Sequence, residues 1–560
     1  MNSSKRIAGE RRAAAAWARL ATRPWPAPLV TTALALVAAL VAGAQLTLLL
    51  VFLNPDLPLS AGGLVAATLR FGLLLAPVAL AAFVLGMRRR NVRASRLLPW
   101  ALTVVLAAAA LGDWVNASHH AFYLPPGINA QLLKGALWLS LGAVLAFYTA
   151  LLHTVHHRAY GARSRWLLAL VVAGSLYALV DRRVSYHPPP PPTPAAARPV
   201  AGPAPRLLFV GLDGASLDVI LPLARQGRLP FFAGLLEQGS YARLAALSPV
   251  RPLALWTSAA TGKMPHRHGL LGDAHAAPRW LAPAGELKLL PLGAGPRLGR
   301  VLFGPTLSPG EQPRSALTVW EILGKLRPPA ETIGFPPALA GFQPPLAPAP
   351  EPAAPAEEPF AEPLAAAQRL DRPRLAAATA RLSGGDPPAS CFLLLPGLEE
   401  LSLATGGGFE AAELAGSRGR EQRRAAAALT TYYAELDAAL AALWEQLPSP
   451  RVVVVASVYG VAPAQGVRKV LGELLRFRRS AGSLAGAPDG ALLMRGDGIR
   501  KGEAMPPGRI VDLLPTLLYL SGLPIARDFD GRVLTEAFEP ALLQREPLAF
   551  LPTYQGLFGD

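Results

Sequence analysis

The sequence predicts a protein in two parts: a bundle of membrane-spanning helices, followed by an α/β domain built on a mostly parallel sheet. Long apolar runs crowd the first third of the chain, and 52% of the 560 residues are hydrophobic. After residue 205 the pattern changes to short apolar strands that alternate with amphipathic helices. Short, uninterrupted apolar strands are typical of a parallel sheet that helices cover on both faces.

Five apolar runs predict about five transmembrane helices between residues 29 and 181. A membrane span needs roughly 20 apolar residues. The runs cover residues 29–53, 63–86, 97–115, 132–152 and 166–180. The third carries Asp113 near its end, and the fifth is short. The first run is too long for a removed signal peptide and lacks a small-residue cleavage site.

The distribution of basic residues predicts the topology. Lysine and arginine gather in the tail 1–28 and in the loops 88–96 and 158–165, whereas loops 54–61 and 119–131 hold almost none. By the positive-inside rule, the N-terminus is cytoplasmic, and the chain after a fifth span lies on the outer, periplasmic side of an inner membrane. Arg182 and Arg183 run against this rule, and failure of one weak span would leave the large domain in the cytoplasm. The same clusters account for much of the net charge of +17, so no nucleic-acid partner is expected.

A Pro/Ala-rich linker, residues 182–205, separates the two parts. Its five consecutive prolines favour an extended polyproline II spacer. Within the following domain, residues 206–560, the stretch 343–374 is dense in Pro, Ala and Glu and is expected to be a flexible insertion. Cys391 is the single cysteine, which excludes an internal disulfide.

Apolar strands and amphipathic helices can be placed along the second part. Strands are expected at residues 207–210, 392–395 and 452–455, and helices at 217–226 and 424–446. In the last helix, Tyr432, Tyr433, Leu436, Leu440 and Leu443 recur on one face. This alternation is the basis of the predicted α/β sheet.

A set of motifs in a fixed order carries a family resemblance. The motifs are the strand and acidic turn 207–214, the segment 256–263, His268-Gly269, the helix 513–518 and Asp530-Gly531-Arg532. Together they resemble the type I phosphodiesterase/nucleotide pyrophosphatase branch of the alkaline phosphatase superfamily. The resemblance covers most of residues 206–540 and implies an alkaline-phosphatase-like α/β fold.

The resemblance also implies a site with two divalent metals, usually zinc, and a Thr or Ser nucleophile. Two-metal phosphoester hydrolysis needs ligands for both cations and a hydroxyl that attacks phosphorus. Asp213 matches the first ligand position. The nucleophile position falls on Pro252, which has no side-chain oxygen.

Most of the remaining ligand positions hold residues that cannot bind a metal well. An Asp and His pair falls on Glu399 and Leu403, a second such pair on Val458 and Tyr459, and the last histidine near Leu484. Apolar replacements remove the repulsion that metal-free carboxylates would suffer. Asp213 and Glu399 are then residual ligands, able to hold at most one hard cation such as magnesium or calcium loosely.

A replacement metal site is an alternative interpretation. His266, His268, Asp273 and His275 lie close together in the sequence. Isolated histidines are more often packed or hydrogen-bonded, and His268 matches a family histidine that is mostly structural.

Three functions remain compatible with the sequence. In the first, a membrane-anchored domain has lost phosphoester hydrolysis and acts as a binding, scaffolding or regulatory subunit, with another membrane or envelope protein as partner. In the second, an altered site is still active as a phosphodiesterase, phosphatase or headgroup phosphotransferase. In the third, the membrane bundle has a structural or transport role; its spans hold few ionisable residues, mainly Arg70 and Asp113, which does not favour transport.

Overall fold

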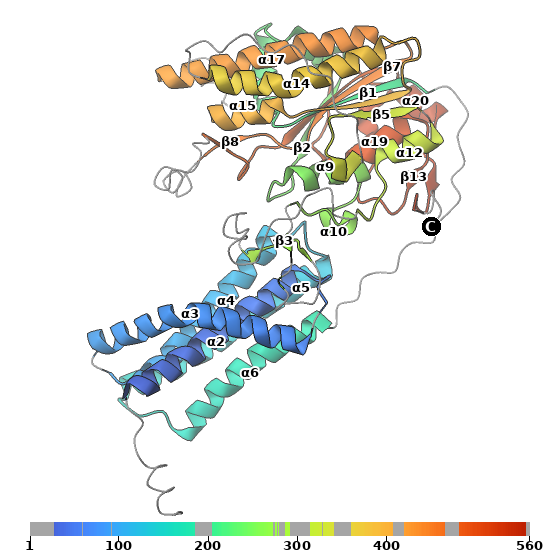
Figure 1. Cartoon of the computed structure of the whole chain (residues 1–560). Coiled ribbons are helices and arrows are strands. Elements are labelled where there is room, and N and C mark those ends of the chain that lie inside the picture. The colour runs from blue at the N-terminus through green and yellow to red at the C-terminus, as the bar shows by residue number, and fades with distance from the viewer. Residues whose placement is uncertain are drawn as a thin grey trace, which may run out of the picture. The chain divides into compact units, whose positions relative to one another are not determined.

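The computed structural model describes two compact units, each of them discontinuous in the sequence (Figure 1). The first comprises residues 1–118, 126–187 and 275–305, and the second comprises residues 119–125, 188–274 and 306–560. The described residues are 27–58, 60–90, 92–184, 204–272, 275–276, 278, 286–291, 314–327, 329–340, 360–406, 419–464 and 481–555. The basic tail and most of the predicted linker lie outside them.

Long helices form the first unit at each of the five predicted apolar runs. In the described residues they are α2 (Ala27–Leu53), α3 (Ala61–Arg90), α4 (Ala94–His119), α5 (Pro126–Val155) and α6 (Ala162–Val184). The first four are long and apolar enough to cross a membrane. The helix α6, which has arginines near both of its ends, is not among these four helices of the described residues. It extends to Val184, so the linker begins later than the predicted residue 182.

Small residues and polar pairs hold these helices together. A Cβ atom at Gly43 of α2 would lie 2.5 Å from the backbone nitrogen of Gly72 in α3, so the two backbones touch where only glycine fits. The Gln45 amide of α2 donates a hydrogen bond of 3.0 Å to the Ser175 hydroxyl of α6. The helix α6 is therefore bonded into the bundle through α2.

A mixed sheet forms the centre of the second unit. Its described strands run in the order β11-β2-β10-β7-β1-β6-β5, with β12 also paired to β2. They are β1 (Arg206–Leu212), β2 (Gly239–Ala245), β5 (Ala330–Ile333), β6 (Ser390–Leu395), β7 (Arg451–Ser457), β10 (Gly490–Gly496), β11 (Glu503–Ala504) and β12 (Gly508–Arg509). The strands β5, β6, β1 and β7 are parallel, as predicted, whereas β10 is antiparallel to both of its neighbours.

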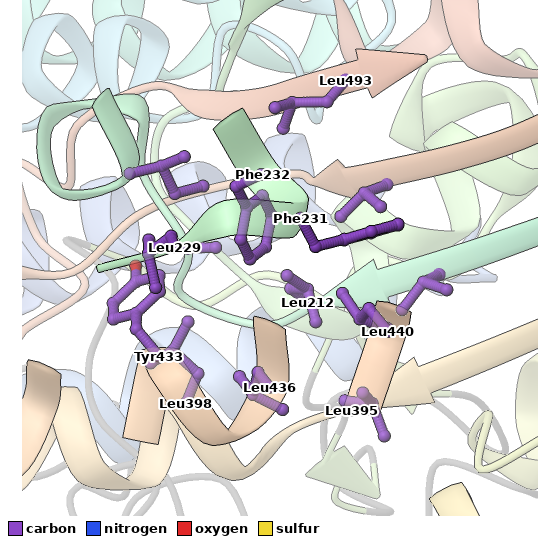
Figure 2. Close-up of a cluster of buried hydrophobic side chains, with 14 of the residues drawn as sticks. Leu212, Leu229, Phe231, Phe232, Leu395, Leu398, Tyr433, Leu436, Leu440 and Leu493 are labelled. Atoms are coloured by element: carbon purple, nitrogen blue, oxygen red, sulfur yellow. The ribbon is translucent and has the colours of Figure 1, made fainter. Parts of the chain in front are cut away.

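The main core lies between this sheet and a layer of long helices (Figures 1 and 2). That layer contains α7 (Leu217–Arg225), α8 (Pro230–Gln238), α14 (Ala361–Leu382), α15 (Gly397–Thr405) and α17 (Arg420–Gln446). Because side chains alternate along a strand, Leu208, Val210 and Leu212 of β1 face this core. Figure 2 shows Leu212 and Leu395 close to Leu436 and Leu440, which are on the predicted apolar face of α17.

The opposite face of the sheet carries an aromatic cluster. Phe209 of β1 contacts the indole of Trp256 edge-on, with ring centroids 6.4 Å apart. Trp256 belongs to α9 (Pro252–Thr261), and this face also packs against α12 (Val319–Leu326) and α19 (Leu513–Leu520). Trp320 and Phe335 complete the cluster. The sheet is therefore covered on both faces, as its apolar strands predict.

The flexible insertion predicted over residues 343–374 is wrong from Ala361 onward. Residues 361–382 form α14, and Ala367, Ala378 and Leu382 of this helix are buried in the main core. Alanine and leucine are strong helix formers, and their burial outweighs the Pro373 that interrupts the helix pattern. The earlier part of the segment, up to residue 359, lies outside the described residues.

Asp437 of α17 holds the start of α8, and its loss should destabilise the second unit. Its two carboxylate oxygens accept the backbone N–H groups of Phe231 and Phe232 at 3.0 and 2.8 Å. In Asp437→Ala these buried donors lose their partner, so we expect the free energy of unfolding to fall by about 1–3 kcal/mol. Chemical denaturation of the detergent-solubilised chain measures this. Glu445→Ala, on an exposed face of the same helix, should change it by less than about 0.5 kcal/mol.

Candidate functional site

The candidate site lies where the parallel strands β1, β6 and β7 end. Asp213 follows β1, Glu399 is in the first turn of α15 just after β6, and Tyr459 follows β7. An isolated bridge pairs Gly214 with Gly460 at this edge. Gly214 has a φ of 82°, and a Cβ atom there would lie 3.0 Å from the Glu399 Cα. Glycine therefore allows the end of β1 to approach α15.

Asp213 is buried, and neutral donors satisfy its carboxylate. The Trp256 indole N–H of α9 donates a short hydrogen bond to Asp213 Oδ1. The Tyr459 hydroxyl also hydrogen-bonds this carboxylate. Burial raises the pKa of Asp213 to about 6, and these two donors and the charge of Arg374 limit the rise.

Tyr459 bridges the two carboxyl groups. Its hydroxyl lies 3.2 Å from Glu399 Oε2 and also bonds Asp213. Burial and the neighbouring charge of Asp213 raise the pKa of Glu399 to about 7. Burial and both carboxylates raise the pKa of Tyr459 well above its ordinary value. The phenol therefore keeps its proton at neutral pH and acts as a hydrogen-bond donor, not as an anionic metal ligand.

A second buried carboxyl group, that of Asp371 in α14, lies beside the first cluster. It accepts hydrogen bonds from the Tyr432 hydroxyl at 2.5 Å and from the Gly397 backbone at 3.1 Å. Burial raises the pKa of Asp371 to about 6. The positive charge of Arg374, one turn further along α14, lowers the pKa of both Asp371 and Asp213. Arg374 thus supplies positive charge to the buried carboxylates.

Asp371 and Arg374 are site residues that the sequence reasoning missed. Both lie in the stretch expected to be a flexible insertion. Alanine and leucine residues at helical spacing, such as Ala367, Ala378 and Leu382, were the available signal for a helix there. Nothing in the sequence shows that this helix would place its charged residues next to Asp213.

The position expected for the nucleophile, Pro252, is on α9 and carries no hydroxyl. Pro252 is the first residue of this helix, and Trp256 follows it by four residues. The nearby hydroxyl groups of α9 are bonded within the fold. Thr257 donates to the Leu253 carbonyl at 2.7 Å, and Ser258 is 3.0 Å from His268 Nε2. Proline in the first turn is favourable for the helix, because no backbone donor is lost there.

The other degenerate positions also lie at this edge of the sheet. Val458 is fully buried, and Leu403 follows Glu399 by one turn of α15. Leu484 is in the loop after β9 (Gly482–Ser483). A Cβ atom at Gly482 would lie 2.9 Å from the Leu403 Cα, so this loop runs against α15. The positions that the resemblance assigns to metal ligands therefore lie near this edge of the sheet, and Leu403, Val458 and Leu484 there are aliphatic.

The four residues of the alternative metal site fall in different parts of the structure. His268 is fully buried; its Nδ1 accepts the Leu270 backbone N–H at 3.2 Å, so the neutral ring donates from Nε2 to Ser258. Burial lowers the pKa of His268 to about 3. Because both ring nitrogens are hydrogen-bonded and the ring is fully buried, His268 is not placed to bind a metal. His266 is partly buried with a lowered pKa, His275 is in β3 (His275–Ala276) of the first unit, and Asp273 lies outside the described residues. The described residues contain no group of three His, Cys, Asp or Glu placed to hold a metal.

The remaining motifs act as structural supports for α9. Lys263 forms a buried ion pair of 2.7 Å with Asp528. Asp530 accepts the Met264 backbone N–H and pairs with Arg267, both at 2.7 Å. At Gly531 a Cβ atom would lie 1.9 Å from the Val511 carbonyl oxygen, so only glycine fits. These contacts fix the helix that presents Trp256.

A family model supports the resemblance that the motifs indicated. Residues 207–280 match the type I phosphodiesterase/nucleotide pyrophosphatase model. That segment contains β1, Asp213, Pro252 and Trp256. The second unit is thus an α/β domain whose first part is similar to this family. No curated protein matches the sequence.

Solved structures show a distant likeness. A protein of Bacteroides thetaiotaomicron assigned as a sulfatase is 15% identical with a TM-score of 0.40, over 59% of this chain and 74% of that one. Human ectonucleotide pyrophosphatase/phosphodiesterase 5 is 11% identical with a TM-score of 0.38, over 61% and 99%. Its murine counterpart is 11% identical with a TM-score of 0.37, over 57% and 95%. What these proteins act on therefore says nothing about this chain.

Raised carboxyl pKa values at the site predict a fall in stability with rising pH. Glu399 moves from an ordinary pKa of 4.5 to about 7, and Asp213 from 3.8 to about 6. Between about pH 4 and pH 7 the native state holds more protons than the unfolded chain. The stability that these two carboxyl groups contribute is therefore fully present below about pH 4 and is lost as the pH rises through 7. We expect a loss of about 3–4 kcal/mol from Glu399, since one pKa unit is worth about 1.4 kcal/mol.

Two substitutions test whether Glu399 causes the fall in stability with rising pH, or whether titration of other groups causes it. Glu399→Gln should flatten the fall and stabilise the protein above pH 7, as measured by denaturation between pH 4.5 and 8. Asp218 has a lowered pKa because Arg243 bonds its carboxylate, so Asp218→Asn should leave the fall in place. A Glu399→Gln variant with the unchanged slope would show that this carboxyl group is not the cause.

Proposed function

We propose that the α/β domain does not hydrolyse phosphoesters and serves as a membrane-anchored binding or regulatory subunit. The observation that carries this proposal is the position of Tyr459, whose hydroxyl bonds both Asp213 and Glu399. A phenol that keeps its proton occupies the place where a divalent cation would neutralise the two carboxylates. The proposed partner is another membrane or envelope protein, and no nucleic acid is expected.

The residues present do not fit two divalent cations. Structural or catalytic zinc takes most of its shell from histidine, cysteine and carboxylate side chains. Here Leu403, Val458 and Leu484 offer no donor atom, and Asp213 already accepts the indole proton of Trp256. Arg374 provides the compensating charge through a guanidinium group instead. Without a nucleophile at Pro252, no phosphoryl-transfer step can be assigned to the site.

The purified protein is expected to contain well below one zinc ion per chain and to show no turnover of an aryl phosphodiester or aryl phosphate. Elemental analysis after dialysis from zinc-containing buffer measures the first property, and a chromogenic assay measures the second. Asp213→Asn is the matched control, because it keeps the shape of the side chain and removes the charge that a metal needs. Two zinc ions per chain, or turnover that Asp213→Asn abolishes, would contradict the proposal and favour an altered but active enzyme.

We also propose that α6 crosses the membrane, which makes five spans. Asn54, which directly follows α2, bonds the backbone of Leu289, a residue that the chain reaches from the α/β domain. If only the helices α2 to α5 crossed, the domain would lie on the opposite side from the loop after α2, and this contact could not form. A fifth crossing by α6 removes the conflict. The basic loops then favour a cytoplasmic N-terminus and an outer, periplasmic position for the domain.

Cysteine labelling tests this topology. The native Cys391 is buried, so single new cysteines can be placed in the unmodified background. Ser60→Cys and Thr193→Cys should react with a membrane-impermeant maleimide added to spheroplasts, whereas Arg93→Cys should react only after the membrane is opened. Opposite labelling of Ser60→Cys and Thr193→Cys would show that α6 does not cross. Reversed labelling of all three would show that the orientation is inverted.

A further inference from the structure

A short segment of the chain, residues 286–290, belongs to the membrane-helix unit although both of its flanks lead into the α/β domain. The domain is described up to residue 272 before this excursion and again from residue 314. The segment begins with β4 (Glu286–Leu287) and is called the docking segment below. It lies against the end of α2 and the start of α3.

The Asn54 side chain binds the backbone of the docking segment with its full hydrogen-bonding capacity. Its Nδ2 donates to the carbonyl oxygens of Leu50 at 2.9 Å and Leu289 at 2.8 Å. Its Oδ1 accepts the backbone N–H groups of Lys288 at 2.7 Å and Leu289 at 3.0 Å. An amide has two donor hydrogens and two acceptor lone pairs, so nothing is left over for water. Asn54 is 3% exposed, which makes each of these bonds costly to lose.

Apolar contacts surround this polar clamp. Leu287 and Leu290 are 0% and 5% exposed. They pack in one cluster with Leu50, Leu57, Ala67 and Phe71 of the two helices and their loop. Lys288 also pairs with Asp56 at 3.2 Å, but the Asp56 side chain is 77% exposed, so this ion pair adds little. Attachment therefore rests on burial of the two leucines and on the Asn54 amide.

We propose that the docking segment is a second attachment of the α/β domain to the membrane helices, independent of the linker after α6. A loop that merely passed over the bundle would not need a buried asparagine to satisfy backbone groups of two of its residues. The partner surface is the α2–α3 hairpin of the same chain, and the ligand is an extended backbone with two leucine anchors. Whether the site hydrolyses anything has no bearing on this attachment.

Cutting the linker tests the second attachment directly. A site-specific protease sequence inserted after Thr193 allows the full chain, in native membranes, to be cut between its two parts. We expect the fragment after the cut to remain with the membranes through washing, because the docking segment holds it. Asn54→Leu leaves three backbone groups without partners and should increase the washed-off fraction at least tenfold.

Two further variants make the result specific. Leu287→Asp places the change on the other partner and should release the fragment in the same way, and an unchanged melting temperature of the released fragment shows that it is folded. Ser140→Ala is the control, since that hydroxyl bonds the Ala136 carbonyl within α5 and should leave the fragment bound. Release of the fragment from the chain without a docking substitution would overturn the proposal. Retention of the fragment in Asn54→Leu and Leu287→Asp to the same extent as without these substitutions would overturn it as well.

Discussion

The buried carboxylate of Asp213 is the constraint around which the α/β domain is organised. It ends the central strand β1, where only 6% of the residue is exposed. An unpartnered charge in such a place costs several kcal/mol, so the fold must supply either cations or donors. Trp256 supplies a donor, Tyr459 supplies a hydroxyl that Asp213 shares with Glu399, and Arg374 supplies positive charge. Trp256 and Tyr459 therefore act together, because each forms a hydrogen bond with the carboxylate of Asp213.

The same constraint explains the arrangement of the helices that cover the sheet. Asp371 of α14 bonds Tyr432 of α17 and the first residue of α15, Gly397. A Cβ atom at Gly397 would lie 2.2 Å from the Tyr432 hydroxyl oxygen, so only glycine permits this junction. Glu399 follows Gly397 by two residues in α15. Contacts among α14, α15 and α17 therefore determine its position beside Tyr459. The contacts of Asp371 therefore fix the start of α15, the helix that carries Glu399.

Much of the fold could be predicted because its signals are local. The uninterrupted apolar runs of β1, β6 and β7 indicate parallel strands, and parallel strands bring residues at their carboxyl ends together. The family resemblance, which assigns Asp213, Glu399 and Tyr459 to one site, was sufficient to predict that they lie in one cluster. The antiparallel β10 and the contribution of α14 were not predictable in this way, because direction and pairing depend on tertiary packing. The role of Trp256 was hidden for the same reason, since an indole in a helix usually indicates core packing alone.

The contact between Asn54 and Leu289 was hidden for a different reason, which is sequence separation. The two residues are 235 positions apart, and neither carries a motif. The docking segment leaves the α/β domain after α10 (Pro265–His268), and this short helix is itself bonded to α9 through Ser258 and to Asp530 through Arg267. The segment therefore starts from a part of the domain that is fixed in place. The Asn54 contact is therefore visible only in the folded chain, because no local pattern marks either the asparagine or the segment that it binds.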